Sequence, residues 1–315
     1  MPVNCFSGKN VLITGGTGSF GHAATQELLK QNVASLTIFS RDEEKQFSMQ
    51  HQFTDPRIKY VIGDVRDYEA VHEAMKGMDI VYHAAALKII PTCENHPMES
   101  LKTNVLGTWN IKKAATENEA EKAIFIGTDK SVLPVNVYGA CKMFAEKLWV
   151  QNQDGITKFS SVRYGNILGS RGSIVPYFKE LIEQGKPIPI THPEMTRFIL
   201  TLKQAFGLVM RATEEMKGGE IYVPKIPACK IMDLALALSG DDYPAETVGV
   251  RAGEKIHETL INQEEFRRTE DKGNYYVVHP YGKFENAEPK EYSSDKTKML
   301  TVEELRIMLK EEGWI

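Results

Sequence analysis

Short apolar runs alternate with amphipathic segments along the first half of the chain. Six runs lack polar alternation and are predicted to be buried strands, at residues 10–13, 36–39, 60–62, 79–83, 123–126 and 159–163. Apolar positions with helical spacing lie between them, at residues 23–31, 68–76, 100–118 and 137–150. Strands that are apolar on both faces and joined by helices indicate a parallel sheet covered on both sides. Because such crossovers are right-handed, we predict an α/β fold with a doubly wound parallel sheet.

The pattern changes after Tyr164. Glycines and prolines punctuate the following segment, and two amphipathic helices are predicted at residues 231–238 and 302–309. We therefore expect a first domain over residues 1–164 and a smaller, mainly substrate-binding C-terminal lobe over residues 165–315. Segments near 195–226 are expected to return to the first domain. The polar stretch 279–297 is expected to run over the surface.

The composition and charge of the chain limit the classes of partner that we expect. The 315 residues carry a net charge of -4, which gives no electrostatic reason to expect a nucleic acid or an anionic membrane as partner. No apolar run is long enough to span a bilayer, and the N-terminus is too polar for a signal peptide. The four cysteines are scattered without a CxxC pair, so neither a metal site nor a disulfide framework is expected. These features favour a cytoplasmic protein.

A glycine-rich segment follows the first predicted strand and opens the first helix. Its residues are Thr14, Gly15, Gly16, Thr17, Gly18, Ser19, Phe20 and Gly21. Gly15, Gly18 and Gly21 suit a tight turn, a close approach to a pyrophosphate, and close packing of helix on sheet. The helix N-terminus offers free N–H groups to phosphates. Glycines also serve plain tight turns, but the strand–loop–helix context favours a dinucleotide site.

The end of the second strand bears on the choice of cofactor. An acidic residue at this place usually binds the ribose of NAD, whereas Ser40 and Arg41 suit the 2′-phosphate of NADP. Arg41 could instead be a solvated surface charge, and Asp42 leaves NAD possible as the cofactor. Asp64 and Val65 follow the third strand, where adenine is expected; the alternative for Asp64 is a helix cap.

Two groups of polar residues are candidates for catalysis. Tyr138 and Lys142 lie four residues apart in a helical pattern, so they share one face, and a nearby ammonium would lower the pKa of the phenol. A surface Tyr–Lys pair is the alternative. Thr128, Asp129 and Lys130 follow the fifth strand, where ligands bind in open α/β sheets. An acid and a base here suit elimination of water, unless they form a solvated ion pair.

Several further motifs occur in order along the chain. They include Ser-Arg-Asp-Glu-Glu-Lys-Gln, Gly-Asp-Val-Arg-Asp, His-Ala-Ala-Ala-Leu-Lys, Thr-Asp-Lys before Tyr-x-x-x-Lys, Arg-Tyr-Gly-Asn, Gly-Ser-Arg-Gly-Ser, Met-Thr-Arg-Phe and Gly-Val-Arg-Ala-Gly-Glu-Lys. From Gly8 to Pro280 the chain resembles the inverting UDP-N-acetylglucosamine 4,6-dehydratases that begin pseudaminic acid synthesis. These enzymes belong to the extended short-chain dehydrogenase/reductases with a Rossmann domain. Departures are Ile199, where the family often has Trp, and Thr92 and Cys93. Tyr138 stands where some related dehydratases carry Met.

The resemblance implies NADP that is held tightly and recycled, UDP-N-acetylglucosamine as substrate, and a homo-oligomer, in several cases a hexamer. It adds cofactor contacts at Lys45, Ala84, Ala85, Ala86 and Lys88. It places substrate contacts at Lys88, Asn166, Gly169, Ser173, Val175, Thr196, Arg197, Arg251 and Glu254. Arginine also suits a diphosphate on chemical grounds, although Arg197 and Arg251 could be plain surface residues.

Three alternatives stay open from the sequence. A UDP-sugar 4-epimerase or a simple dehydrogenase would share the fold but would not need Asp129 and Lys130. A 4,6-dehydratase that retains the C5 configuration is the second alternative. A non-catalytic NADP sensor would have no use for an activated phenol at Tyr138.

Overall fold

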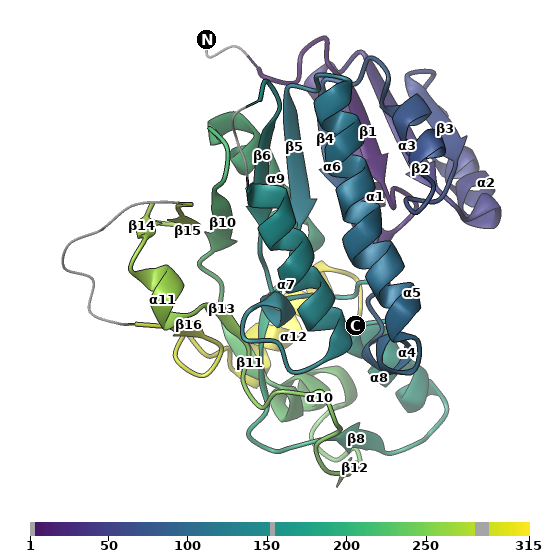
Figure 1. Cartoon of the computed structure of the whole chain (residues 1–315). Helices are drawn as coiled ribbons and strands as arrows, with labels where there is room; N and C mark the ends of the chain where they lie inside the picture. The colour runs from purple at the N-terminus through teal and green to yellow at the C-terminus, as the bar shows by residue number, and fades with distance from the viewer. Residues whose placement is uncertain (1–3, 152–154, 281–289) are drawn as a thin grey trace.

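A computed structural model describes residues 4–151, 155–280 and 290–315 and contains a large central sheet (Figure 1). Nine strands follow the order β14-β15-β10-β6-β5-β4-β1-β2-β3. The parallel strands are β1 (Asn10–Thr14), β2 (Ser35–Ser40), β3 (Ile58–Ile62), β4 (Ile80–His83), β5 (Lys122–Ile126), β6 (Lys158–Val162) and β10 (Ile221–Pro224). The antiparallel edge consists of β15 (Tyr275–Val278) and β14 (Thr269–Asp271). The predicted doubly wound α/β sheet is confirmed.

Helices cover both faces of this sheet, each over a buried apolar layer. On one face, α1 (Ser19–Leu28) lies beside α9 (Leu202–Glu215). On the other face lie α3 (Tyr68–Met75), α6 (Gly107–Glu117) and α7 (Val137–Val150), which pack around Trp149. The sheet strands are apolar on both sides because both faces are covered.

The predicted helices differ from the observed ones in several places, and α8 (Ile174–Glu183), α9 and the short α4 (Ile90–Asn95) and α11 (Gln263–Phe266) were not predicted. The first helix begins at Ser19, earlier than predicted, because the glycine-rich loop runs directly into it, and a 3-10 turn, η1 (Leu29–Gln31), ends it. The stretch 100–118 is not one helix: α5 (Pro97–Leu101) continues through a π-helical turn, η2 (Lys102–Leu106), into α6. The helix α2 (Glu43–Gln52) was not predicted, because it is polar and has little apolar periodicity.

The second half of the chain forms smaller layers below the carboxyl ends of the sheet strands (Figure 1). A three-stranded sheet contains β7 (Asn166–Ile167), β9 (Thr196–Leu200) and β11 (Ala228–Lys230), and a two-stranded one contains β8 (Ile188–Ile190) and β12 (Ala245–Thr247). The helices here are α8 (Ile174–Glu183), α10 (Ile231–Ser239) and α12 (Val302–Glu311). The division of the chain at residue 164 stays a prediction.

The stretch 279–297 does not simply follow the surface. Residues 281–289 lie outside the described part of the chain, but Tyr292, Ser293 and Ser294 are buried. They pair in β16 (Tyr292–Ser293) with β13 (Thr259–Ile261), next to the short helix α11 (Gln263–Phe266). The prediction was wrong there because the tyrosine and the serine hydroxyls make buried hydrogen bonds.

None of the described helices combines the length and apolar character needed to cross a membrane. Within the same residues, no group of His, Cys, Asp or Glu side chains has an arrangement that could hold a metal ion.

Candidate active site

A cavity of about 1090 Å³ lies between the carboxyl ends of the sheet strands and the second half of the chain. Both halves line it: Gly15, Ser40 and Thr128 come from the sheet side, and Asn166 and Arg251 come from the later segments. Its volume lies just above the usual range of about 300–1,000 Å³ for pockets that bind small ligands, so it suits a large ligand.

The glycine-rich loop forms one end of the cavity. Gly15 has φ +64°, and a Cβ there would lie 2.8 Å from the Cα of Ala85. At Gly21 a Cβ would lie 1.9 Å from the carbonyl oxygen of Gly16, so only glycine lets α1 pack this closely. Gly18 is the N-cap residue of α1 and makes no side-chain cap, which leaves first-turn N–H groups for an anion.

Not all eight loop residues reach the cavity. Gly15, Thr17, Gly18, Ser19 and Phe20 line it, whereas Thr14, Gly16 and Gly21 lie behind the turn. The buried Thr14 hydroxyl is 2.7 Å from Nδ1 of His83. Thr14 thus acts by fixing β1 to the end of β4, and we expect no direct contact with a ligand.

The residues that were expected to select the cofactor lie at the same end. The Arg41 side chain is 55% exposed, and its Nη1 lies 3.6 Å from Oδ2 of Asp64. Asp42 accepts a hydrogen bond from the amide of Lys45 at 3.0 Å and caps α2. The Asp42 carboxylate is therefore engaged with its own helix, whereas Arg41 extends at the rim of the cavity.

The end of β4 forms the floor of the cavity. Ala84, Ala85, Ala86 and Lys88 line it. Asn104 in η2 holds this segment, because its amide accepts from the Leu87 N–H and donates to the Leu87 carbonyl, both at 2.8 Å. Burial, with the charges of Lys130 and Arg171, lowers the pKa of Lys88. Sequence reasoning missed Asn104, since an isolated Asn in a helical stretch gives no signal.

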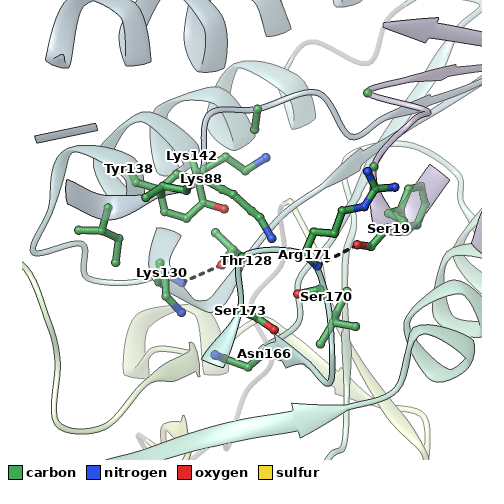
Figure 2. Close-up of a pocket in the computed structure, with 18 of the residues that line it drawn as sticks. Ser19, Lys88, Thr128, Lys130, Tyr138, Lys142, Asn166, Ser170, Arg171 and Ser173 are labelled. Atoms are coloured by element: carbon green, nitrogen blue, oxygen red, sulfur yellow. Dashed lines mark hydrogen bonds between the residues drawn. The ribbon is translucent and has the colours of Figure 1, made fainter. Parts of the chain in front are cut away.

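Tyr138 and Lys142 project from α7 toward the cavity, as Figure 2 shows. The Lys142 ammonium donates to the carbonyl of Ile126 at 2.6 Å and lies 3.7 Å from the centroid of the Phe125 ring. Burial lowers the pKa of Lys142 to about 7. Burial raises the pKa of Tyr138 to about 12, against the opposing effects of Lys130 and a hydrogen bond with Thr128. The predicted lowering of the phenol pKa is therefore not found.

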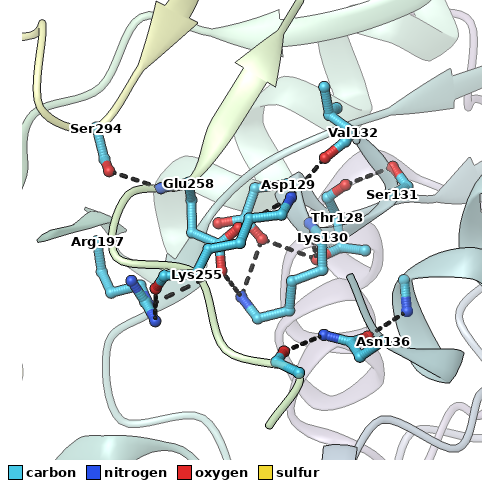
Figure 3. Close-up of polar contacts among 12 residues, drawn as sticks. Thr128, Asp129, Lys130, Ser131, Val132, Asn136, Arg197, Lys255, Glu258 and Ser294 are labelled. Atoms are coloured by element: carbon cyan, nitrogen blue, oxygen red, sulfur yellow. Dashed lines mark hydrogen bonds and ion pairs between the residues drawn. The ribbon is translucent and has the colours of Figure 1, made fainter. Parts of the chain in front are cut away.

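Asp129 and Lys130 form an ion pair at the tip of β5 (Figure 3). Oδ1 of Asp129 accepts from the Thr128 hydroxyl and from Nζ of Lys130, both at 3.0 Å. Lys130 lines the cavity, but Asp129 is fully buried behind it and does not. Nζ of Lys130 also lies 3.4 Å from Oε1 of Glu258, a cavity residue that sequence reasoning missed because no motif includes it.

The charges around this pair decide how it is protonated. Burial acts to lower the pKa of Lys130, but the carboxylates of Asp129 and Glu258 outweigh it and raise that pKa overall. Burial raises the pKa of Asp129, and the charge of Glu258 adds to this effect. The sequence left open whether Lys130 is neutral or charged, and the resting arrangement favours the charged ammonium.

The structure brings together most, but not all, of the predicted substrate residues. Lys88, Asn166, Ser173, Arg197, Arg251 and Glu254 line the cavity. Gly169, Val175 and Thr196 lie outside its lining. Gly169 faces the Trp314 ring, with no room for a Cβ. Val175 is part of the core around α10 and α12, and Thr196 is hydrogen-bonded to His257 and Ser294.

Two arginines differ from expectation. Arg197 donates to the carbonyls of Thr196, Ile256 and Lys255 at 2.7, 3.1 and 3.0 Å, so it supports a loop rather than offering a free fork to a diphosphate. Arg171 was not singled out from the sequence. Its guanidinium donates to the carbonyl of Thr17 at 2.8 Å, and its amide donates to the Ser19 hydroxyl at 3.0 Å (Figure 2).

The family follows from comparison with known proteins. Residues 11–280 match the model of a family described as polysaccharide biosynthesis protein. The chain belongs to this family. Within it, the chain is 47% identical to a UDP-N-acetylglucosamine 4,6-dehydratase (inverting) of Campylobacter jejuni, over 89% of this chain and 85% of that protein. It is also 43% identical to a protein of Rickettsia bellii named UDP-glucose 4-epimerase, over 96% of both chains.

A solved structure extends the likeness to three dimensions. The fold of this chain matches the X-ray structure of Pen from Bacillus thuringiensis with a TM-score of 0.93. The two chains are 35% identical, and the match covers 99% of each. The chain is thus an enzyme-family member with an extended short-chain dehydrogenase/reductase fold, as predicted. The names of its relatives include both dehydratase and epimerase, which are separate chemical outcomes.

Proposed function

We propose that the protein removes water from UDP-N-acetylglucosamine across C5 and C6, with transient oxidation at C4 and inversion at C5. The product would be UDP-2-acetamido-2,6-dideoxy-β-L-arabino-hex-4-ulose, an early intermediate of pseudaminic acid synthesis. The observation that carries the proposal is the Asp129–Lys130 pair at the cavity wall, in the same cavity as Tyr138. An epimerase needs to move a hydride at C4 only, and it has no use for this pair.

The residues at the glycine-rich end fit a dinucleotide, and we propose NADP. The close approach of Gly15 to Ala85 and the uncapped start of α1 suit a pyrophosphate. The exposed guanidinium of Arg41 suits a 2′-phosphate, and Asp42 is engaged in capping α2. When bound, NADP would accept a hydride from C4 and return it to C6.

The chain's own residues would then handle the protons. Tyr138 takes the proton of the C4 hydroxyl, and its phenolate form is stabilised by the positive charge that the oxidised cofactor brings. Lys142 stands beside it on α7. Once C4 is a ketone, the C5 hydrogen is acidic, because the resulting carbanion is an enolate.

Lys130 is the group placed to remove that C5 proton. A proton shift from its ammonium to Asp129, across the 3.0 Å contact, gives the free amine and a neutral carboxyl. The departing C6 hydroxyl needs a proton, which the Asp129–Lys130 pair supplies through Lys130, the member that faces the cavity. A proton that comes from solvent to the opposite face of C5 gives inversion, and Tyr138 releases to solvent the proton that it took from the C4 hydroxyl.

We also propose a cytoplasmic homo-oligomer. Large apolar side chains are exposed on adjoining helices of one side of the sheet, at Met98, Leu101, Leu106, Trp109 and Phe144. Exposed apolar residues on neighbouring elements mark association surfaces. Analytical ultracentrifugation tests this point, and a hexamer is the state expected from the family resemblance.

The decisive experiment is product analysis with UDP-N-acetylglucosamine. Mass spectrometry should show loss of one water without net accumulation of NADPH, and NMR ring couplings should show the inverted C5. A product of unchanged mass would favour the second candidate, a 4-epimerase, which the name of the Rickettsia bellii relative supports. Loss of water with unchanged C5 configuration would indicate a retaining dehydratase.

A further inference from the structure

Glu258 places a second carboxylate on Lys130, from the other half of the chain. Lys130 follows β5, whereas Glu258 directly precedes β13. The Glu258 side chain is 2% exposed and borders the cavity, and its backbone N–H donates to the Ser294 hydroxyl at 2.9 Å. The ion pair therefore crosses the cavity wall from one half of the chain to the other.

The surroundings of Glu258 keep it ionised. Its Oε1 lies 3.4 Å from Nζ of Lys130 and 3.9 Å from Nε of Arg197, and its Oε2 lies 3.6 Å from Nζ of Lys255. Oε2 has no hydrogen-bond partner among the described residues. Burial acts to raise the pKa of Glu258, but Lys130, Arg197 and Lys255 outweigh it and lower that pKa.

The two nearby cations are committed to the backbone. Arg197 donates to three carbonyl oxygens, and Lys255 donates to the carbonyl of Val132. Lys130 and Arg197 both line the cavity, but the Arg197 guanidinium is engaged with the backbone, so Lys130, which is 19% exposed, is the cation better placed to meet a ligand. A carboxylate at 3.4 Å acts on it through an electrostatic interaction that burial strengthens.

Asp129 and Glu258 are not equivalent partners of Lys130. Asp129 is fully buried, and its Oδ2 has no hydrogen-bond partner within the described chain. Its pKa is raised by burial and by Glu258, whereas the pKa of Glu258 is lowered. Three cations face Glu258, so of the two carboxyl groups it is the more readily ionised, and Asp129 is the more readily protonated.

We propose that Glu258 is a positioning residue: it is the fixed counter-ion of the Asp129–Lys130 pair, holding Lys130 at the cavity wall and keeping an additional proton on the pair. Its catalytic meaning rests on the proposed dehydration, in which this pair exchanges protons with C5 and C6. The charged and titratable groups that face Lys130 are Asp129, Glu258, Arg197, Lys255, Lys88 and Tyr138. Among them, Glu258 is the carboxylate contributed from outside the pair.

The test measures the protonation of Lys130 without relying on turnover. The intact protein is labelled for short times with acetic anhydride at a series of pH values, and mass spectrometry follows Lys130 against the exposed Lys76, which follows α3. Acetic anhydride acylates only the free amine. In the unmodified protein, Lys130 should become reactive at a higher pH than Lys76. Reactivity at the same or a lower pH would overturn the proposal, whether or not any variant folds.

Two variants give the direct comparison. Glu258→Gln keeps the shape but removes the charge, and should lower the labelling midpoint of Lys130 by at least about one pH unit. Glu220→Gln is the matched control, since Glu220 is a buried carboxylate outside the cavity, bonded to Ser160 and to the amides of Lys217 and Gly218. It should leave the midpoint in place. An equal midpoint in Glu258→Gln and the unmodified protein would refute the counter-ion role.

Kinetics then connect the site to the reaction. With UDP-N-acetylglucosamine, the limb of the kcat–pH profile that reports the Asp129–Lys130 pair should move to lower pH in Glu258→Gln, with KM nearly unchanged. A purely structural role for Glu258 would change stability but leave that limb in place. If the labelling midpoint shifts while no UDP-sugar is turned over even by the unmodified protein, the proposed function falls and the counter-ion assignment stands.

Discussion

The side-chain amide of Asn136 donates to the carbonyl oxygen of Gly253 at 2.7 Å, while its Oδ1 accepts from the amide of Gly139 at the same distance. The first bond reaches the loop of Arg251 and Glu254, and the second caps α7, the helix of Tyr138. One side chain thus ties a predicted substrate loop to the start of the predicted catalytic helix.

Replacing Asn136 should separate these two roles. Asn136→Ala loses both bonds and should cost about 0.5–2 kcal/mol of stability, the usual value of an N-cap. Asn136→Asp keeps the cap acceptor but cannot donate to Gly253, so it should retain stability and raise KM for the UDP-sugar. Thr301→Ala, which removes the N-cap of α12, is the control for stability alone. Thermal unfolding measures the stability, and steady-state kinetics measure KM. Equal KM values in all three variants would contradict the role of the Asn136–Gly253 bond in substrate binding.

Arg41 should set the preference for NADP. Arg41→Ala should weaken NADP binding by about 1–3 kcal/mol, the range for a charge-assisted contact, with little change for NAD. Arg66→Ala is the matched control, because Arg66 also pairs with Asp64, at 2.6 Å, but does not line the cavity. Titration calorimetry with both dinucleotides checks this. Equal losses for NADP and NAD would remove Arg41 from the specificity argument.

Lys142 should make the cofactor-free protein more stable as pH rises above neutrality. Its pKa is about 7 in the folded chain, because of burial, and returns to the ordinary lysine value near 10.5 on unfolding. Between these values the unfolded state binds more protons, so the free energy of unfolding increases with pH. Below pH 7 both states are charged and the penalty is complete. Lys142→Met should therefore raise stability at pH 7 by about 1–3 kcal/mol and flatten the pH dependence.

Denaturant unfolding from pH 6.5 to 9.5 measures this effect. Lys112→Met offers a comparison, since Lys112 is also buried but donates to the carbonyls of Leu148 and Gln151 at the end of α7. Its replacement removes those bonds and should destabilise the protein. A Lys142→Met protein that loses stability at pH 7 would show that its bond to Ile126 outweighs the burial of charge.

Replacement of Tyr138 and replacement of Lys130 should block different stages of the reaction. Tyr138→Phe should lower kcat by at least about 10²-fold and largely retain substrate binding, because C4 cannot be oxidised. Lys130→Ala should allow oxidation, seen as NADPH absorbance, but stop the loss of water. In heavy water, the product of the unmodified enzyme should carry deuterium at C5, and deuterium placed at C4 should reappear at C6. Normal water release by Lys130→Ala would rule out its assignment.

The sequence predicts the sheet well because its strands are apolar on both faces, and α7 because its apolar positions have helical spacing. The sequence does not predict the features that depend on polar interactions or on contacts between distant parts of the chain. The helix α2 is mostly polar and depends on the Asp42 cap. Glu258 comes near Lys130 only through tertiary folding, across 128 residues of sequence, so no local pattern could reveal it. Gly169 begins a glycine-rich motif and Val175 follows it closely, yet packing against Trp314 and within the core around α10 turns them away from the cavity.

Arg163 directly follows β6, and its contacts determine whether the chain can be divided into two separate domains. Its guanidinium meets Glu146 of α7, and Glu265 of α11 at 2.9 Å, and it donates to the carbonyl of Leu260 at 2.9 Å, all in the interior. A fragment that ends at residue 164 would lose two of these three partners and would also expose the edge of β6 that β10 covers. Such a fragment would carry a half-satisfied arginine beside an open sheet edge, and it should aggregate rather than fold. Residues 1–164 are therefore not expected to form an independent module for grafting, and during synthesis the partners of Arg163 are complete only when residues near 265 have left the ribosome.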